Sequence, residues 1–577
     1  MASFHPILFF LCYHFVFTSN GASASRRVFL FPESDQETSS IASNQYRTAC
    51  HFQPPKNWMN DPNGPMHYNG VYHLFYQYNP YSVVAGNKSW GHSTSTDLIN
   101  WTPQDPAIDR NKPYDINGCW SGSATILHGS KPVILYTGID TEKRQVQNVA
   151  IPKNLSDPFL REWTKPDYNP IMEPIDGINA SQFRDPMTAW HGSDGHWRVA
   201  VGAEIEGNGT AILYKSNDFV HWVRAASPLH TSRGSGMWEC PDFYPVLSKG
   251  RQGLDTSENS RDVKHVLKMS LAETQSDHYM LGRYDLEKDV FVPDKTVDDY
   301  REWLRYDYGK FYASKTFFDE KKKRRILWSW LNESDSKADD LLKGWAGIQA
   351  VPRTIWLDSN GRQLVQWPVK ELESLRRTGA HLHNTELKTG GLFEIKGVKA
   401  SQANVEVDFE LPNLEIAKPF DPSWLIDPPK LCRDEDASVQ GGLGPFGLLI
   451  LASPNLEEHT AVFFRVYKAH NRYRVLLCSD QRRSSLRPEV DKPAYGSFVD
   501  IDIKKEGKIS LRTLIDHSVV ESFAGGGRTC ITARVYPEVL VTGDIHLYAF
   551  NNGTETIKVS KLQAWDMAKP WINVEGE

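Results

Sequence analysis

Three acidic motifs hold the carboxylates of this sequence that are best suited to catalysis. They are Asn57–Gly64 (NWMNDPNG), Phe183–Pro186 (FRDP) and Met237–Phe243 (MWECPDF). Asp-Pro and Asn-Gly are turn signals, so the first motif alone would indicate only a solvated turn. In the third motif, Glu239 lies between a Trp and a Cys and just before a Pro. We expect such a side chain to be partly desolvated, which suits it to general-acid chemistry.

Aromatic residues near the first motif favour a sugar pocket over a plain turn. Trp58 and the segment Tyr72–Gln77 supply rings that suit sugar faces, and the chain has 18 Trp and 23 Tyr. The same rings could equally pack in an all-β core. In the second motif, Arg184 beside Asp185 could be no more than a surface ion pair, which would contribute little. Each motif is therefore weak on its own.

Short strand patterns and turn residues alternate along the part of the chain that holds these motifs. The segment Ser95–Trp101 (STDLINW) is matched in residue type and spacing by Ser216–Trp222 (SNDFVHW). We interpret both as the same turn in two copies of an antiparallel unit, with chance similarity as the alternative. Such repetition over ~300 residues predicts a β-propeller, which protects its sheet edges by radial closure.

The chain is too long for one ordinary core, so we expect two large domains. After Trp367 the pattern changes: residues 369–377 have a helical pattern, and longer alternating strands later predict a β-sandwich. We predict an all-β chain with these parts: a signal peptide at 1–24, a flexible or processed leader at 25–45, a catalytic propeller at 46–376, a linker at 377–390 and a sandwich at 391–577.

The N-terminus and the sequons favour secretion. The apolar run Ile7–Phe17 ends before the small residues Ala22–Ala24 and is too short to span a bilayer. The residues before it include no Lys or Arg, which departs from the usual signal-peptide pattern. No other run approaches membrane-spanning length, so we expect no membrane partner. Seven candidate glycosylation sites agree with a secretory route: Asn87, Asn100, Asn154, Asn179, Asn208, Asn332 and Asn552.

Charge and cysteine spacing limit the partners and cofactors. With a formal net charge of -6, the chain has no basic surplus to neutralise phosphates, so we expect no nucleic-acid partner. No Cys-x-x-Cys spacing occurs, so we predict no metal site, and nothing calls for an organic cofactor. Sparse cysteines in a large secreted chain permit one disulfide and several buried thiols.

Taken together and in this order, the three motifs resemble glycoside hydrolase family 32, the plant group of invertases, fructan exohydrolases and fructosyltransferases. The resemblance extends from about Tyr46 to Trp571. It implies a five-bladed propeller followed by a β-sandwich, and retaining hydrolysis of terminal β-fructofuranosyl bonds. Asp61 would be the nucleophile, Glu239 the acid/base, and Asp185 would hold the fructosyl hydroxyls and stabilise the transition state.

The resemblance also implies a substrate pocket, a disulfide between Cys432 and Cys478, and no cofactor. Its partners would be a fructan or sucrose substrate and cell-wall polysaccharide, with a proteinaceous inhibitor left open, and the enzyme would be a monomer. The implied substrate-binding residues are Trp58, Asn60, Gln77, Trp90, Trp120, Ser121, Arg184 and Asp307.

Two departures from the family's invertases concern the leaving-group side of the substrate. Invertases carry a Trp where this chain has Ala85. They also carry an Asp and a Lys or Arg, three residues apart, that recognise glucose; here Ala272 and Gln275 take those positions. In an alternative alignment Glu273 would stand in for the Asp. Loss of such a hydrogen-bonding pair removes discrimination worth about a few kcal/mol.

Other positions favour a secreted hydrolase. Pro241 matches the cell-wall members of the family, and the retained Asn60 favours hydrolysis over fructosyl transfer. We therefore expect a secreted, apoplastic fructan exohydrolase. A cell-wall invertase is the first alternative, and a catalytically idle fructoside-binding protein is the second.

Overall fold

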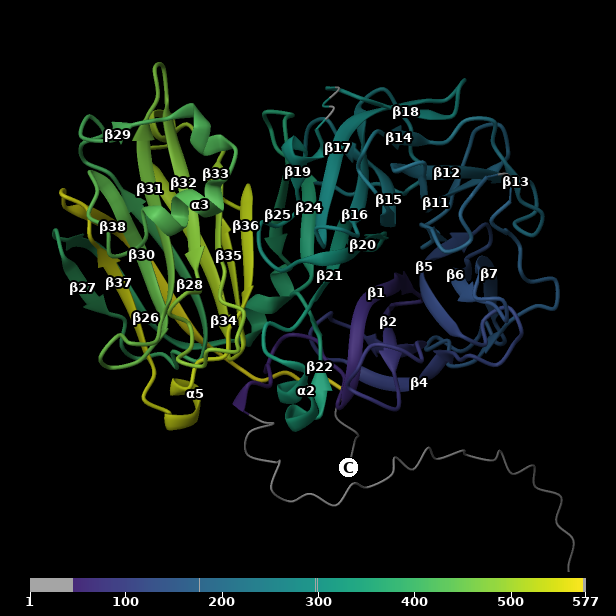
Figure 1. Cartoon of the computed structure of the whole chain (residues 1–577), viewed down its shortest axis with the longest axis horizontal. Helices are drawn as coiled ribbons and strands as arrows, with labels where there is room; N and C mark the ends of the chain where they lie inside the picture. The colour runs from purple at the N-terminus through teal and green to yellow at the C-terminus, as the bar shows by residue number, and fades with distance from the viewer. Residues whose placement is uncertain (1–44, 176, 296, 298, 574–577) are drawn as a thin grey trace, which may run out of the picture. The chain divides into compact units, whose positions relative to one another are not determined.

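The computed structural model describes residues 45–175, 177–295, 297 and 299–573 (Figure 1). The predicted signal peptide, and the leader apart from residue 45, lie outside the described residues. Within them, no helix combines the length and the apolar character that a membrane crossing requires.

Five mainly antiparallel sheets follow one another along the first part of the described chain, and they form the five blades of the predicted propeller. Blade 1 contains β1 (Asn57–Tyr68), β2 (Val71–Asn79), β3 (Ser89–Ser95), β4 (Thr102–Ile108) and β22 (Trp345–Ala346). Blade 2 contains β5 (Gly118–Leu127), β6 (Lys131–Ile139), β7 (Gln145–Pro152) and β8 (Trp163–Thr164). Blade 3 contains β9 (Phe183–Arg184), β10 (Trp190–His191), β11 (Trp197–Ile205), β12 (Asn208–Ser216), β13 (Val223–Arg224) and β14 (His230–Ser232).

The last two blades complete the ring. Blade 4 contains β15 (Trp238–Leu247), β16 (Val263–Leu271), β17 (Ser276–Asp285), β18 (Val290–Pro293) and β19 (Leu304–Arg305). Blade 5 contains β20 (Tyr312–Asp319), β21 (Arg324–Leu331), β23 (Ile348–Gln349), β24 (Arg353–Leu357) and β25 (Leu364–Pro368). β1 packs against both β5 and β20, and β22 pairs in parallel with the start of β1.

Blade 1 also binds the far end of the described chain. The backbone N–H of Trp101 donates to the carbonyl of Trp571 at 2.6 Å, and the N–H of Asn573 donates to the carbonyl of Trp101 at 2.9 Å. The Ser93 hydroxyl donates to the Asn573 side chain at 2.7 Å. Segments that are distant in sequence therefore complete the first blade.

The repeated segment predicted from the sequence forms the same turn in blades 1 and 3. In each copy the Ser hydroxyl accepts from the backbone N–H three residues later. The Asp that lies two residues after the Ser accepts from the backbone N–H groups two and three residues beyond itself. Leu98 and Phe219 both take a left-handed conformation, with φ of 66° and 64°. The indole N–H groups of Trp101 and Trp222 donate to the carbonyl oxygens of Leu98 and Phe219 and so close the two turns. The prediction of one turn in two repeated units is confirmed.

Two sheets form the predicted β-sandwich. One contains β26 (Arg376–Leu387), β38 (Ile557–Met567), β28 (Gln402–Glu410), β34 (Lys508–Asp516), β35 (Val519–Ala524) and β36 (Thr529–Arg534). The other contains β27 (Gly391–Glu394), β37 (His546–Asn551), β30 (Leu443–Ala452), β31 (Thr460–Lys468), β32 (Tyr473–Asp480), β33 (Ala494–Val499) and β29 (Lys418–Pro419). Apolar side chains of both sheets, such as Val407, Phe446 and Ile531, fill the space between them.

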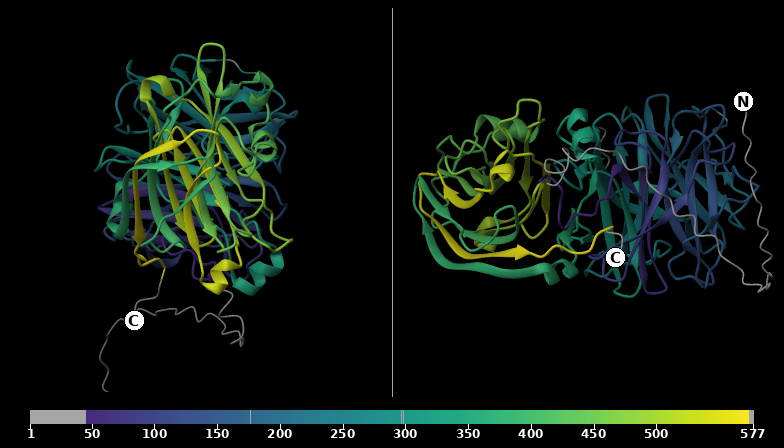
Figure 2. Two further views of the ribbon diagram at one scale, coloured as in Figure 1. Left: turned by 90° about the vertical axis from the view of Figure 1, so that its left-hand side faces the viewer. Right: turned by 90° about the horizontal axis from the view of Figure 1, so that it is seen from below.

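The predicted linker at 377–390 is wrong. Most of it belongs to β26, which pairs with β38 along its length at the edge of the first sheet (Figure 2). The sandwich thus begins at Arg376 rather than at residue 391. An edge strand leaves many side chains in solvent, so its sequence carries little of the apolar alternation that marks a half-buried strand. The preceding helical pattern is a 3-10 helix, η2 (Lys370–Leu375).

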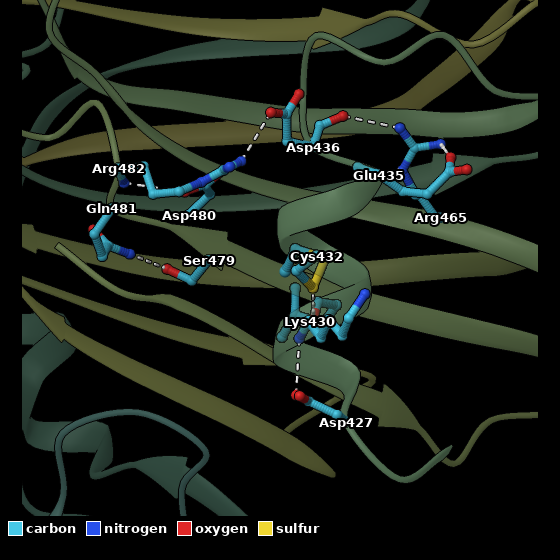
Figure 3. The surroundings of a disulfide bond; sticks show 12 residues. Asp427, Lys430, Cys432, Glu435, Asp436, Arg465, Ser479, Asp480, Gln481 and Arg482 are labelled. Atoms are coloured by element: carbon cyan, nitrogen blue, oxygen red, sulfur yellow. Dashed lines mark hydrogen bonds and ion pairs between the residues drawn. A yellow bond between two sulfur atoms is a disulfide. The ribbon is translucent and has the colours of Figure 1, made fainter. Parts of the chain in front are cut away.

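The implied disulfide joins Cys432 of α3 (Pro428–Asp434) to Cys478 of β32. It lies among ion pairs such as that between Arg482 and Asp436 (Figure 3). Together with the segment around it, α3 covers the outer face of the second sheet, where Leu449 and Phe463 are buried. This cover explains why every residue of β30 is buried. The remaining helices of the described residues are short: η1 (Tyr300–Glu302), α2 (Lys337–Lys343), η3 (Pro422–Leu425), α4 (Ile503–Glu506) and α5 (Val539–Thr542).

Candidate active site

The innermost strands of the blades carry irregularities where the predicted site residues gather. Register shifts interrupt β1 between Met59 and Pro62, β5 between Cys119 and Gly122, β15 between Glu239 and Asp242, and β20 between Tyr312 and Lys315. Bulges of this kind change the direction of side chains near the end of a strand. Asp185 and Cys240 are also left-handed, with φ of 66° and 44°. This backbone strain is concentrated where a functional site is expected.

Asp61 accepts hydrogen bonds on both carboxylate oxygens. The amide of Asn60 donates to Oδ1 at 2.9 Å, and the hydroxyl of Ser121 donates to Oδ2 at 2.5 Å. The Asn60 amide is itself oriented by the indole N–H of Trp58, which donates to its oxygen at 2.8 Å. The structure thus joins four of the predicted site residues, and it holds the half-buried Asp61 carboxylate in one orientation, as a nucleophile requires.

Asp185 lies beside Asp61, and Cys240 connects the two. The Cys240 thiol is 3.6 Å from Oδ2 of each aspartate, and its backbone N–H donates to Oδ2 of Asp185 at 2.9 Å. Asp185 is only 3% exposed. Burial raises its pKa, and the charges of Glu239 and Asp61 add to that effect, while Arg184 opposes it. The carboxylates of Asp61 and Asp185 are therefore held close together, and that of Asp185 is removed from water.

Glu239 is held by two donors, one on each oxygen. Arg184 donates to Oε1 from Nη2 at 2.7 Å and from Nε at 3.1 Å, while the hydroxyl of Tyr312 donates to Oε2. The Glu239 side chain is 24% exposed, which agrees with the expected partial desolvation. Burial and the neighbouring Glu239 charge raise the pKa of Tyr312 far above its usual range, so this hydroxyl stays protonated and donates.

Tyr312 was not predicted from the sequence. It lies in blade 5, and its segment carries no acidic motif. The only signal in the sequence is a Tyr between Phe311 and Ala313 at the start of a strand pattern, which is too common to single out. Cys240 belongs to the third motif, but nothing in the sequence indicates its contacts with the two aspartates.

Trp120 is half-buried near Arg184. The Arg184 guanidinium lies 5.9 Å from the centroid of its ring, and the Lys88 ammonium lies 5.3 Å from it. Cation–π contacts therefore help to hold the Trp120 ring beside Arg184, and its contact with the sugar remains a prediction.

Two other predicted pocket residues are fully buried. Trp90 has no exposed surface, and its indole N–H donates to the carbonyl of Trp120 at 2.9 Å. It supports the backbone of β5, and its contact with the sugar remains a prediction. Gln77 is also buried and donates to the carbonyl of Cys119 at 3.1 Å. Its amide oxygen has no hydrogen-bond partner in the described residues, and its sugar contact remains a prediction.

Asp307 does not join the site, which corrects a further prediction. It is 1% exposed and accepts from Gly309, from the backbone and hydroxyl of Thr532, and from Arg353 at 3.0 Å. Arg353 also donates to Glu521 at 2.6 Å. Asp307 thus connects the propeller to the sandwich. Its sequence context could not reveal this, because Thr532 lies in the other domain and Arg353 lies in a later strand of the propeller.

The residues of the predicted leaving-group side lie beside the site. The turn 272–275 joins β16 to β17, and β16 pairs with β15 at Trp238 and Glu239. The N–H of Ala272 donates to the carbonyl of Met237 at 3.2 Å. Ala85 is exposed, in the loop whose Ser82 accepts from the backbone N–H of Trp58 at 3.0 Å.

The sequons differ in exposure, and the possible metal ligands form groups that do not include these carboxylates. Asn87, Asn100, Asn154 and Asn179 are exposed, while Asn208, Asn332 and Asn552 are half-buried. Two groups of metal-ligand type occur in the described residues: Cys50, His51 and Asp516, and Glu333, Asp335 and Asp340. In the first group His51 donates to Asp516, and in the second the Lys343 ammonium pairs with all three acids.

Comparison with known proteins agrees with this geometry. Residues 51–368 match the glycosyl hydrolases family 32 N-terminal domain, and residues 371–566 match the family 32 C-terminal domain. Beta-fructofuranosidase, insoluble isoenzyme 4, of Oryza sativa subsp. japonica is 62% identical, over 98% of this chain and 97% of its own length. Fructan 1-exohydrolase of Bromus pictus is 58% identical, over 97% of this chain and 93% of its own length.

Among solved structures, fructan 1-exohydrolase IIa of Cichorium intybus in complex with 1-kestose is 51% identical, with a TM-score of 0.90. The match covers 92% of this chain and 100% of that chain. Since both domains match their family models and these relatives span nearly the whole chain, this protein belongs to glycoside hydrolase family 32 and is a glycoside hydrolase.

Proposed function

We propose that this enzyme is a retaining β-fructofuranosidase that removes terminal fructose units from a fructan. The observation that carries the proposal is the placement of two carboxylates in different surroundings. Asp61 accepts from Asn60 and Ser121, as suits a nucleophile, while Glu239 is held by Arg184 and Tyr312, as suits a residue that exchanges a proton. Retaining glycosidases use such a pair.

The reaction would proceed in two steps. Glu239 protonates the glycosidic oxygen while Asp61 attacks the anomeric carbon of the fructosyl unit, and the leaving group departs. Water, deprotonated by the same Glu239, then attacks the fructosyl-enzyme bond and releases fructose with retained configuration. Asp185 would accept hydrogen bonds from the fructosyl hydroxyls, because its Oδ2 is bound by Cys240 and its Oδ1 has no protein donor in the described residues.

The leaving-group side supports a fructan rather than sucrose as the preferred substrate. Neither Ala85 nor Ala272 offers an aromatic wall or a charge, and Gln275 is neutral and exposed. Several similar relatives are named fructan 1-exohydrolases, from Bromus pictus, Triticum aestivum and Hordeum vulgare. Cell-wall invertase is the second candidate, because the rice relative at 62% identity is named an insoluble beta-fructofuranosidase.

We also propose that the enzyme is a glycosylated monomer secreted to the cell wall. The apolar N-terminal run, the exposed sequons and the disulfide between Cys432 and Cys478 support this, since disulfides persist in oxidising compartments. Sequencing the N-terminus of the secreted protein tests the signal peptide, and a mass shift on treatment with an endoglycosidase tests glycosylation. Intracellular retention of the full-length chain would contradict the proposal.

A comparison of substrates tests the activity. Purified enzyme is assayed for fructose release from inulin, levan, 1-kestose and sucrose, with Glu239→Gln as the matched inactive control. We expect a fructan to be cleaved with much higher kcat/KM than sucrose, and the β-anomer of fructose to appear first by NMR. Initial release of the α-anomer would rule out the retaining mechanism, and release from none of the substrates would leave only a binding role.

A further inference from the structure

Lys315 of β20 is a buried cation that the reaction scheme does not use. Its side chain is 2% exposed, and its ammonium donates to the hydroxyl of Ser123 at 3.0 Å. Within the described part of the chain, no carboxylate lies at ion-pair distance from it. An ammonium taken out of water costs several kcal/mol unless nearby charges compensate.

Lys315 is connected to the strands that hold the catalytic carboxylates. Its partner Ser123 lies two residues after Ser121 in β5, and the Ser121 hydroxyl donates to Asp61. In β20 the register shift separates Lys315 from Tyr312, whose hydroxyl donates to Glu239. Strands of two blades therefore connect this ammonium to both sides of the site.

The charges of the site leave the aspartate pair without a direct counter-ion. Asp61 and Asp185 both approach the Cys240 thiol, yet in the described residues neither forms an ion pair with a cation. Arg184 directs its guanidinium to Glu239. Burial raises the pKa of Asp185, and Arg184 and then Lys315 are the positive charges that lower it.

We infer that Lys315 is a positioning residue whose buried ammonium supplies a counter-charge to the carboxylates of Asp61 and Asp185. This inference rests on the proposed roles of the two aspartates in hydrolysis. It concerns the electric field at the site, because in the described residues no hydrogen bond or ion pair joins Lys315 to either aspartate.

The other charged groups around the pair are engaged elsewhere. Lys268 donates to the carbonyl oxygens of Cys240 and Ser314 and lies 3.4 Å from Asp277. Asp242 accepts from the backbone and hydroxyl of Thr316. The charged groups that act on Asp185 or on the neighbouring Cys240 thiol, apart from the two aspartates themselves, are Arg184, Glu239, Lys268 and Lys315.

The test is the pH profile of kcat/KM on 1-kestose. Lys315→Met and Lys315→Gln remove the charge, Lys315→Arg restores it, and Ser123→Ala removes the hydrogen bond while keeping the charge. For both neutral variants we expect the acidic limb to move to higher pH by about one unit, since an opposite charge nearby shifts a carboxylate by about one to three units. The acidic limb of the profile should coincide with wild type for Ser123→Ala and should lie closer to wild type for Lys315→Arg than for the neutral variants.

An acidic limb that coincides with wild type in both neutral variants would overturn the inference, even if activity or melting temperature fell. Failure of both neutral variants to fold would also overturn it, because Lys315 would then be a structural residue. If the wild-type enzyme releases no fructose, the proposed function fails. If the wild-type enzyme releases fructose but the acidic limb does not move in the neutral variants, only the inference about Lys315 fails.

Discussion

Sucrose and a fructan present the same fructosyl group to Asp61 and Glu239, so only the leaving-group side can distinguish them. The variant Ala85→Trp, Ala272→Asp, Gln275→Lys rebuilds that side in the invertase pattern. Gln275 is already left-handed, with φ of 46°, so Lys can replace it without new backbone strain. Ala272 follows the strand position opposite Trp238, which places a carboxylate there at the edge of the site.

A hydrogen bond to a charged group contributes about 1.5–3 kcal/mol, and the two new charges are three residues apart and will not act additively. We therefore expect kcat/KM for sucrose to rise by about 10- to 100-fold, since about 1.4 kcal/mol corresponds to a factor of ten. The assay measures glucose release from sucrose and fructose release from 1-kestose by wild type and variant. A matched control, Gln275→Ala, removes a side chain without adding charge. Efficient cleavage of sucrose by the unmodified enzyme would refute the reasoning, and the invertase alternative would then be correct.

Three further changes test other parts of the structure. Glu239→Gln should lower turnover by about 10²–10⁴-fold, because the leaving oxygen loses its proton source, and a near-normal rate would move the acid/base role elsewhere. Tyr312→Phe should lower kcat by about 10- to 100-fold with KM little changed, since it removes one donor to a charged group, and an unchanged kcat would contradict a role for the hydroxyl. His51 donates to Asp516 at 2.8 Å and to Glu521 at 2.9 Å; burial opposes its charge, but these two carboxylates outweigh burial and raise its pKa to about 9. Because this folded-state pKa is above the ordinary value of 6.5, the stabilisation is full below 6.5 and is lost as the pH rises toward 9. Urea unfolding should show His51→Gln less stable than wild type by about 3 kcal/mol at pH 6, with the difference much smaller above pH 9, and a constant difference would contradict the assignment.

The sequence predicted those parts of the site that carry a local signature. Asp61, Asp185 and Glu239 each stand in a motif of unusual residues, and the structure brings their segments together from three blades. The repeated turn with Trp101 and Trp222 indicated the propeller, because its hydrogen bonds are formed within one short segment. Local interactions of this kind leave a pattern in the sequence.

Parts that depend on contacts between distant segments could not be predicted. Tyr312 reaches Glu239 only because blade 5 closes against blade 4. Asp307 was assigned to the sugar, yet its partners Thr532 and Arg353 lie far away in sequence. Residues 377–390 have the sequence pattern of a linker, because an edge strand exposes polar side chains to solvent just as a linker does.

The closure of blade 1 has a consequence for synthesis of the chain. β1 is made early, but its edge neighbour β22 follows only after blades 2, 3 and 4 and the first two strands of blade 5, and residues 571–573 arrive last of the described chain. A chain emerging from the ribosome would therefore present the unpaired edge near Trp58 for much of translation, when exposed strand edges are prone to pair with other chains. The catalytic arrangement of the nascent protein is therefore complete only after β20, which carries Tyr312, has been made.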